Sequence, residues 1–329
     1  MIDELRVRIE KKRWRRKSPL IIHGYRWDHV DVATVYVTAG GKTGRGEGAP
    51  LFYFGETADD LVNALIQSKA RIEGGLTRAD IPKLALPSGA RNALDCALWD
   101  LEAKISDTPT FKSAGFENLR PVPFLCTLSI GEPGDMAREA KELSHVPILK
   151  LKLDGDRPVE KTAAVRDARP EATLLIDANC AWSPEELATF SPPLKDLGVE
   201  MVEQPMPPER DSFLDDYNSP IPLCADESCQ TKESLPTLTG KYQLINIKLD
   251  KCGGLTPALS LANSAKEMGF DLMVGNMLGS SLAMAPAFLV AQLCRYSDLD
   301  GPVEFEKDCD SPMEFRDALV FPPTRELWG

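Results

Sequence analysis

Short apolar runs that each end in a charged residue recur along the second half of the chain. The last residues of five successive runs lie 25, 26, 23 and 22 positions apart, which is the length of one strand plus one helix. Polar residues at the carboxyl ends of successive strands are typical of a parallel βα barrel, because that end of the fold is where its chemistry takes place. The five runs are residues 148–152, 174–177, 201–203, 222–226 and 244–248.

The same alternation of strand and helix continues on both sides of these runs. Further strands are predicted at residues 122–128 and 271–275, and a short last strand is predicted to end near residues 298–300. Together with the five runs they make eight strands. Helical periodicity fills the intervals between the strands. The predicted helices are residues 132–143, 158–168, 184–197, 256–268 and 282–293.

The first part of the chain has a different pattern. A strand is predicted at residues 30–39, with a turn at the Gly40-Gly41 pair, and a loop follows at residues 44–50. Residues 88–105 then show the apolar periodicity of a helix. This mixture predicts an α+β domain in front of the barrel.

These patterns divide the chain into three segments. Residues 1–115 are the predicted α+β domain, and residues 116–304 are the predicted βα barrel with the active site. Residues 305–329 are rich in proline and charge, and we expect them to return to the first domain.

Composition narrows the class of function. The chain has 329 residues, 43% of them hydrophobic, which is enough for a barrel and a smaller second domain. The net charge of −12 and the pI near 4.9 argue against nucleic acid or an anionic membrane as a partner. The basic stretch at residues 11–17 is an exception, which we interpret as an exposed strand and loop face, with nucleic-acid binding as the alternative.

The eight cysteines include no Cys-x-x-Cys pair and show no metal-binding pattern with the three histidines. They are predicted to be free thiols in a reducing cytoplasm. The chain begins with charged residues and contains no apolar run of about 18 residues. We therefore expect a cytoplasmic protein without a membrane partner.

Three carboxylates end successive predicted strands: Asp177, Glu203 and Asp226. The carboxyl ends of parallel strands meet at one mouth of a barrel, so these side chains are expected to lie close together. Three carboxylates without a neighbouring histidine or cysteine motif supply only oxygen ligands, which favours Mg²⁺. The alternative is that the acids merely cap strand ends at the surface.

Lysines lie on both sides of these carboxylates. Lys150 and Lys152 share one face of their strand because side chains alternate, and Lys248 is expected across the barrel mouth. To act as a base at neutral pH, a lysine must have its pKa lowered to about 7 from a reference near 10.4. We expect the metal and, for Lys152, the ammonium of Lys150 to lower it. Two opposed amines beside a metal-bound carboxylate indicate a racemase or epimerase that works through a metal-stabilised enediolate.

The chain resembles the enolase superfamily, muconate-lactonizing subgroup, over its whole length. The resemblance implies a (β/α)-barrel of the modified TIM type with an N-terminal α+β capping domain that the C-terminal tail completes. It implies Asp177, Glu203 and Asp226 as Mg²⁺ ligands, with Lys152 and Lys248 as the acid/base pair. The mandelate-racemase type is disfavoured because no histidine follows His145. The segments that resemble the family are residues 149–153, 176–179, 202–205, 225–228 and 246–254.

Within the subgroup the chain is most similar to dipeptide epimerases. Asp298 and Asp300 match the Asp-x-Asp that receives the substrate's α-ammonium in those enzymes, although a surface turn is the alternative for this segment. Muconate cycloisomerase and o-succinylbenzoate synthase remain the other enzyme candidates. A catalytically silent barrel that binds a ligand is the non-enzyme candidate, and the intact set of acids and lysines weakens it.

The resemblance also suggests residues for specificity. Arg26 could pair with an acidic side chain, which favours L-Ala-D/L-Glu, but it could equally be a solvated strand residue. Lys150 is expected to bind the substrate. Thr127 could offer a hydroxyl to it, unless it simply fills its strand. The expected partner is a small dipeptide, with a homo-oligomer as a possibility.

Overall fold

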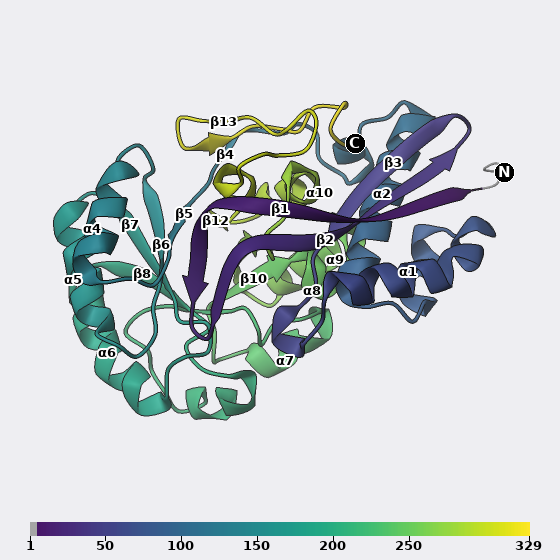
Figure 1. Ribbon diagram of the computed structural model, residues 1–329. Helices are drawn as coiled ribbons and strands as arrows, with labels where there is room; N and C mark the ends of the chain where they lie inside the picture. Colours follow the sequence, from purple (N-terminus) through teal and green to yellow (C-terminus); the bar gives the residue numbers. More distant parts are fainter. Residues whose placement is uncertain (1–4) are drawn as a thin grey trace.

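The computed structural model describes residues 5–329. It consists of an α+β capping domain and a βα barrel (Figure 1). The capping domain has an antiparallel sheet in the order β1-β2-β3. Helices pack on this sheet, the longest being α2, as the apolar periodicity predicts. The elements are β1 (Arg6–Ile22), β2 (Tyr25–Ala39), β3 (Lys42–Gly48), η1 (Phe52–Phe54), α1 (Ala58–Glu73), η2 (Arg78–Lys83), α2 (Ser88–Ser106) and α3 (Thr110–Ser113).

The predicted loop at residues 44–50 is wrong for residues 44–48, which belong to strand β3. The glycines in this segment suggested a loop, but three of them alternate along the strand and face helix α2: Gly44, Gly46 and Gly48. A Cβ atom at any of them would overlap a backbone carbonyl of the helix. These glycines therefore permit a close approach of strand and helix and do not mark a turn.

The hairpin of β1 and β2 is long enough to reach from the capping domain to the barrel (Figure 1). Its end is fixed to the loop that follows the first barrel strand. The amide of Ile130 donates to the carbonyl of Ile21 at 3.0 Å, and the amide of Ile21 donates to Ser129 Oγ at 3.2 Å. The hairpin thus covers part of the barrel mouth.

The barrel is an eight-stranded parallel sheet in the order β5 to β12, as the spacing of the apolar runs predicts. The amide of Leu125 donates to the carbonyl of Ser297 at 3.1 Å and so joins the two ends of the sheet. The strands are β5 (Cys126–Leu128), β6 (Ile148–Lys152), β7 (Thr173–Asp177), β8 (Val199–Glu203), β9 (Leu223–Ala225), β10 (Leu244–Lys248), β11 (Asp271–Gly275) and β12 (Tyr296–Ser297).

The five predicted helices between the strands are confirmed to within two residues at each end. Two further short helices follow strands β9 and β10, and a 3-10 helix replaces an α-helix after β8. The helical elements are α4 (Pro133–Glu142), α5 (Pro158–Ala168), α6 (Pro184–Asp196), η3 (Pro208–Leu214), η4 (Lys232–Ser234), α7 (Leu235–Leu238), α8 (Leu249–Cys252), α9 (Leu255–Glu267), α10 (Ser281–Ala291) and η5 (Gly301–Glu304).

Two strand predictions need correction. The predicted strand at residues 122–128 is split, because β4 (Val122–Pro123) pairs with β14 (Leu319–Val320) in a separate small sheet with β13 (Phe315–Arg316). Only its second half enters the barrel. The last barrel strand ends at Ser297, so Asp298 and Asp300 lie in the turn that leads into η5.

The C-terminal tail returns to the capping domain. The indole of Trp328 donates to the carbonyl of Cys96 at 3.0 Å, and the amide of Gly329 donates to Asp100 Oδ1 at 2.7 Å. Both acceptors lie on helix α2. All eight cysteines are free thiols. Among the described helices, none is long and apolar enough to cross a membrane.

The interior of the barrel changes character along its axis. Its lower part is a separate apolar cluster that includes Leu175, Met201 and Cys224. Side chains alternate along a strand, so the residues two positions later point into the barrel as well. These are Asp177, Glu203 and Asp226. The ionic residues therefore rest on an apolar floor at the carboxyl end of the strands.

We predict that Gly46→Ala lowers the free energy of unfolding by about 2 kcal/mol or more, because its methyl group meets the carbonyl of Ala93 in helix α2. Urea unfolding measures the change. Gly134→Ala is the matched control, since Gly134 has open space around it and lies in the exposed start of helix α4. This control should be neutral or stabilising by about 0.5–1 kcal/mol. Equal effects of the two substitutions would contradict the packing argument.

Candidate active site

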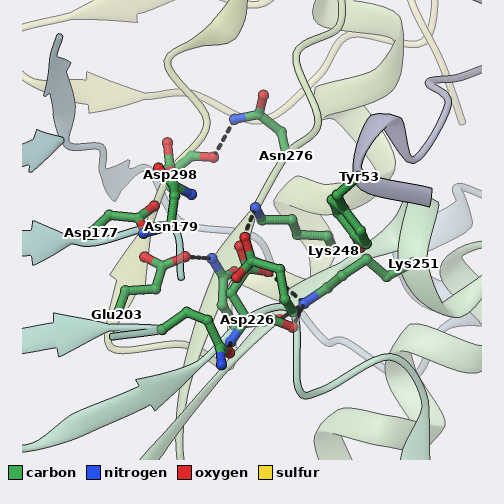
Figure 2. A network of polar contacts seen from close by, with 12 residues as sticks. Tyr53, Asp177, Asn179, Glu203, Asp226, Lys248, Lys251, Asn276 and Asp298 are labelled. Carbon is green, nitrogen blue, oxygen red and sulfur yellow. Dashed lines mark hydrogen bonds and ion pairs between the residues drawn. The ribbon is translucent and has the colours of Figure 1, made fainter. Parts of the chain in front are cut away.

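Five strands bring their last residues together at the barrel mouth (Figure 2). Lys150 and Lys152 come from β6, and each of the next four strands adds one further ionic side chain at or directly after its end. All of these side chains are buried, none being more than 9% exposed. The four residues are Asp177, Glu203, Asp226 and Lys248.

Lys150 is the centre of one group of ion pairs. Its Nζ lies 2.8 Å from Glu203 Oε2, 3.0 Å from Asp177 Oδ2 and 2.8 Å from Asp298 Oδ2. The neighbouring Lys152 Nζ lies 2.6 Å from the same Asp177 oxygen. Two ammonium groups therefore share the Asp177 carboxylate, and together they offset two of the three negative charges around Lys150.

Asp226 is held from both sides. Lys248 Nζ lies 2.6 Å from Oδ2, and Lys251 Nζ lies 2.6 Å from Oδ1 (Figure 2). Lys251 also donates to the carbonyl of Asn246 at 2.9 Å, and the Asn246 side chain donates to Glu203 Oε1 at 2.7 Å. Sequence reasoning missed Lys251 and Asn246, although both lie in the segment 246–254 that it singled out.

The pKa values reflect this mutual neutralisation. Burial alone would raise the pKa of Asp177, but the charges of Lys150 and Lys152 outweigh burial and hold it at about 2. Burial would lower the pKa of Lys248, but the charges of Asp226 and Glu203 raise it well above its ordinary value. The pKa of Lys150 is raised in the same way, against burial, by the acids around it.

From the sequence we expect a lowered pKa for the catalytic lysines beside a metal, but among the carboxylates alone the pKa of Lys248 is raised. The reason is physical: each ammonium faces carboxylates at 3.0 Å or less, and their attraction exceeds the repulsion between ammonium groups. A lowered pKa requires that these carboxylates take another positive partner.

The cluster contains more hydrogen-bond acceptors than donors. Six buried polar side-chain atoms in the described residues lack a hydrogen-bond partner, and four of them are oxygens in or beside this cluster. One is Glu203 Oε2, which faces Lys150 without hydrogen-bond geometry. Unpartnered oxygens of this kind suit a hard cation. The other three are Asn179 Oδ1, Glu227 Oε2 and Asn246 Oδ1.

The three carboxylates are not close enough together in this structure to hold a metal ion. Within residues 5–329, no three His, Cys, Asp or Glu side chains are close enough together to hold an ion. The lysines explain this arrangement, because their ammonium groups lie among the carboxylate oxygens. That Asp177, Glu203 and Asp226 bind a cation stays a prediction.

The structure brings Asp298, Asp300 and Thr127 to the same wall. Asp298 pairs with Lys150, and its carbonyl accepts from the Asn276 side chain at 2.7 Å (Figure 2). Asp300 Oδ2 accepts a hydrogen bond from the backbone amide of Thr127 at 2.9 Å. Burial and the charge of Asp298 raise the pKa of Asp300 to about 7.

Arg26 is not brought to the site. Its side chain is 55% exposed and pairs with Asp28 at 3.0 Å. Its neighbour Trp27 lines the cavity, and because side chains alternate along β2, Arg26 points to the other face of the hairpin. The structure therefore favours the solvated-residue alternative for Arg26.

A cavity of about 410 Å³ lies between the cluster and the capping domain. Aromatic residues of the cap form its upper wall, where Trp27 and Tyr53 both pack edge-on against Phe52. Tyr53 lies near Lys248 (Figure 2), and its hydroxyl oxygen accepts from Gln230 Nε2 at 3.2 Å. The cap thus closes the barrel mouth with apolar surface, which strengthens charge interactions beneath it.

The fold is a parallel barrel beneath an α+β cap, with acids and amines buried at the barrel mouth. This combination is typical of a barrel enzyme whose active site lies under a capping domain. The chain belongs to the enolase superfamily. Residues 135–326 match the enolase C-terminal domain-like family. Residues 4–115 match the N-terminal domain of the mandelate racemase / muconate lactonizing enzyme family.

Two relatives are similar over most of the chain. The L-Ala-D/L-Glu epimerase of Escherichia coli K12 is 38% identical over 94% of this chain and 97% of its own. The N-acetyl-D-glutamate racemase of a Pseudoalteromonas species is 46% identical over 74% of this chain and 78% of its own.

Two solved structures share the fold. An enolase family member from Agrobacterium tumefaciens, described as homologous to dipeptide epimerases and solved with sodium and L-Ala-L-Glu, has a TM-score of 0.96 at 37% identity. It covers 99% of this chain and 100% of its own. A dipeptide epimerase from Enterococcus faecalis, complexed with Mg and L-Leu-L-Tyr, has a TM-score of 0.90 at 26% identity, with 97% of each chain covered.

We predict that Lys150→Met lowers the stability of the metal-free protein by about 3–5 kcal/mol, because it leaves buried carboxylates without their shared ammonium. Urea unfolding in a chelating buffer measures the loss. Arg138→Met removes an exposed ion pair with Asp135 and should cost no more than about 0.5 kcal/mol. If both variants unfold at the same urea concentration, Lys150 does not neutralise the cluster.

Proposed function

We propose that the protein is a Mg²⁺-dependent dipeptide epimerase that acts on L-Ala-D/L-Glu. The observation that supports this most strongly is the position of two amines, Lys152 and Lys248. Each pairs with a different buried carboxylate at 2.6 Å, and the strands that hold them, β6 and β10, are separated by three strands in the sheet. The similarity to the E. coli epimerase agrees with it.

Asp177, Glu203 and Asp226 would hold the Mg²⁺. The residues fit the ion because they offer carboxylate oxygens, and because buried oxygens around them lack hydrogen-bond donors. When bound, the ion supplies positive charge that stabilises the negative charge developing on the substrate's carboxylate.

Lys152 and Lys248 move the proton. A substrate whose α-carbon lies between them presents its α-hydrogen to one amine and its opposite face to the other. One amine removes the proton, and the other returns a proton to the opposite face, which inverts the centre. Lys150 is buried behind Lys152 and orients the substrate's carboxylate.

Asp298 and Asp300 would receive the α-ammonium of the dipeptide. Both carboxylates lie on the wall that follows β12, and Asp300 is held there by the amide of Thr127. A charge-assisted contact to a buried carboxylate fixes the amino end of the substrate, so that its α-carbon stays between the two lysines.

The two-base proposal predicts a stereospecific loss. Lys152→Ala and Lys248→Ala should each abolish epimerisation, while each still exchanges the α-proton of one stereoisomer with solvent through the remaining amine. Mass spectrometry of L-Ala-L-Glu and L-Ala-D-Glu in D₂O with Mg²⁺ measures the exchange. Lys161→Ala is the control, since Lys161 is a buried lysine that pairs with Asp156 away from the cavity. Exchange of both stereoisomers by either single variant would refute the two-base model.

A racemase of N-acetylglutamate is the second candidate. The similarity to the Pseudoalteromonas enzyme, at 46% identity, favours it. The same lysines and carboxylates would serve this reaction, because the substrate again has a proton next to a carboxylate. The substrates of the two candidates differ at the amino end, since N-acetylglutamate has no ammonium group to bind Asp298 and Asp300.

The substrates separate these candidates. As a dipeptide epimerase, the enzyme should have a higher kcat/KM for L-Ala-L-Glu than for N-acetyl-L-glutamate. Asp300→Asn should reduce kcat/KM for the dipeptide about 30-fold or more, since it removes a charged acceptor from a buried contact. The same substitution should leave N-acetylglutamate turnover within about threefold. If the enzyme prefers N-acetylglutamate and Asp300→Asn does not change this preference, the protein is an N-acetylglutamate racemase instead.

A further inference from the structure

Five Lys or Arg side chains line the cavity, and one of them differs from the rest. Four have a carboxylate oxygen within 3.0 Å, among them Lys11, which lies 2.7 Å from Asp59. Arg16 does not. In the described part of the chain, the carboxylate that pairs with it is Glu304, at 3.7 Å from NH2, which is beyond hydrogen-bond distance.

Arg16 is nevertheless buried. Its side chain is 6% exposed, and its recorded hydrogen bond within residues 5–329 runs from Nε to the carbonyl of Ser18 at 3.0 Å. Burial lowers the pKa of Arg16, which measures how costly this charge is to keep out of water. A guanidinium has five N–H donors in a fixed fork, so most of its hydrogen-bonding capacity faces the cavity unused.

The position of Arg16 is held firmly by the barrel. Arg16 forms an isolated backbone bridge with Phe305, and the amide of Glu306 donates to the carbonyl of Arg15 at 2.9 Å. The ammonium of Lys17 donates to the carbonyl of Val303 at 2.7 Å. The backbone of Arg16 is therefore fixed against the segment that follows β12, the segment that begins with Asp298 and Asp300.

We propose that Arg16 receives a second carboxylate of the substrate, separate from the one at the metal site. The inference rests on the proposed function and adds to it the residue that selects a substrate with two carboxylates. Nε of Arg16 donates to the carbonyl of Ser18, which leaves the edge formed by NH1 and NH2, and such an edge matches a carboxylate by two parallel hydrogen bonds. Arg16 thus takes the role that the sequence suggested for Arg26.

The second carboxylate has two possible sources with the same chemistry. It belongs either to the side chain of the residue whose α-carbon reacts or to the group on its amino side. Pairs of substrates that differ only in Glu against Gln separate these sources, because they change the charge and keep the shape. The pairs are Ala-Glu with Ala-Gln, Glu-Ala with Gln-Ala, and N-acetylglutamate with N-acetylglutamine.

The test compares wild type, Arg16→Met and Arg26→Met on these pairs in the presence of Mg²⁺. Calorimetry measures Kd, and α-deuterium incorporation measures kcat/KM. Wild type and Arg26→Met should prefer the acidic member of at least one pair by about 10- to 100-fold in both quantities. Arg16→Met should reduce this preference to within about threefold. Arg16→Lys keeps the charge without the fork and should retain part of it.

A purely structural role predicts other results. If Arg16 only neutralises Glu304, the double variant Arg16→Met/Glu304→Gln should regain the acidic preference of wild type, and that result would overturn the proposal. An unchanged preference in Arg16→Met, or no preference in wild type, would overturn it as well. Wild type that epimerises neutral dipeptides as well as acidic ones refutes the Arg16 inference alone. If the wild type exchanges the α-proton of none of these substrates, the proposed function is refuted. The Kd values then still decide the role of Arg16.

Discussion

Three carboxylates are buried at the barrel mouth only because ammonium groups are buried with them. Asp177, Glu203 and Asp226 are at most 2% exposed, and removing a single carboxylate from water costs several kcal/mol without a partner. The lysines provide that partner at 2.6 to 3.0 Å. The same contacts raise the pKa of Lys248 above its ordinary value. In the proposed mechanism both amines are released when the carboxylates bind a cation in their place, so cation binding and catalytic competence would be coupled by charge.

The capping domain contributes one wall of the cavity above these charges. Its long hairpin is hydrogen-bonded to the barrel through Ile21, and aromatic residues such as Trp27 line the cavity above the cluster. The cap also adds charges of its own to the cavity. Arg16 faces the wall that carries Asp300, so one side of the cavity offers both a cation and an anion to the substrate. In the proposed function the barrel holds the reacting groups and the acceptors of the α-ammonium, and the cap adds Arg16.

The sequence predicted the parts of this site that depend on spacing along the chain. Asp177 and its counterparts were found because one strand and one helix separate successive residues of the barrel mouth, and alternation along β6 placed Lys150 beside Lys152. Contacts between distant segments left no such signal. Lys251 reaches Asp226 from a short helix, and Gly46 looked like a turn residue because close packing against another element is invisible in a local pattern. The sequence left two interpretations open for Arg26, and the structure favours the solvated one, because Arg26 lies one position from Trp27 and so faces away from the cavity.

Calorimetric titration of Mg²⁺ tests the central claim most directly, since it asks whether the buried carboxylates exchange their lysine partners for a cation. We predict one Mg²⁺ site in the wild type. Asp226→Asn should raise the Kd for Mg²⁺ at least about 100-fold, because the variant removes a charged ligand. Asp211→Asn is the control, as Asp211 is a largely buried aspartate hydrogen-bonded to Tyr242 outside the cluster. Equal Mg²⁺ affinity in wild type and Asp226→Asn would contradict the account.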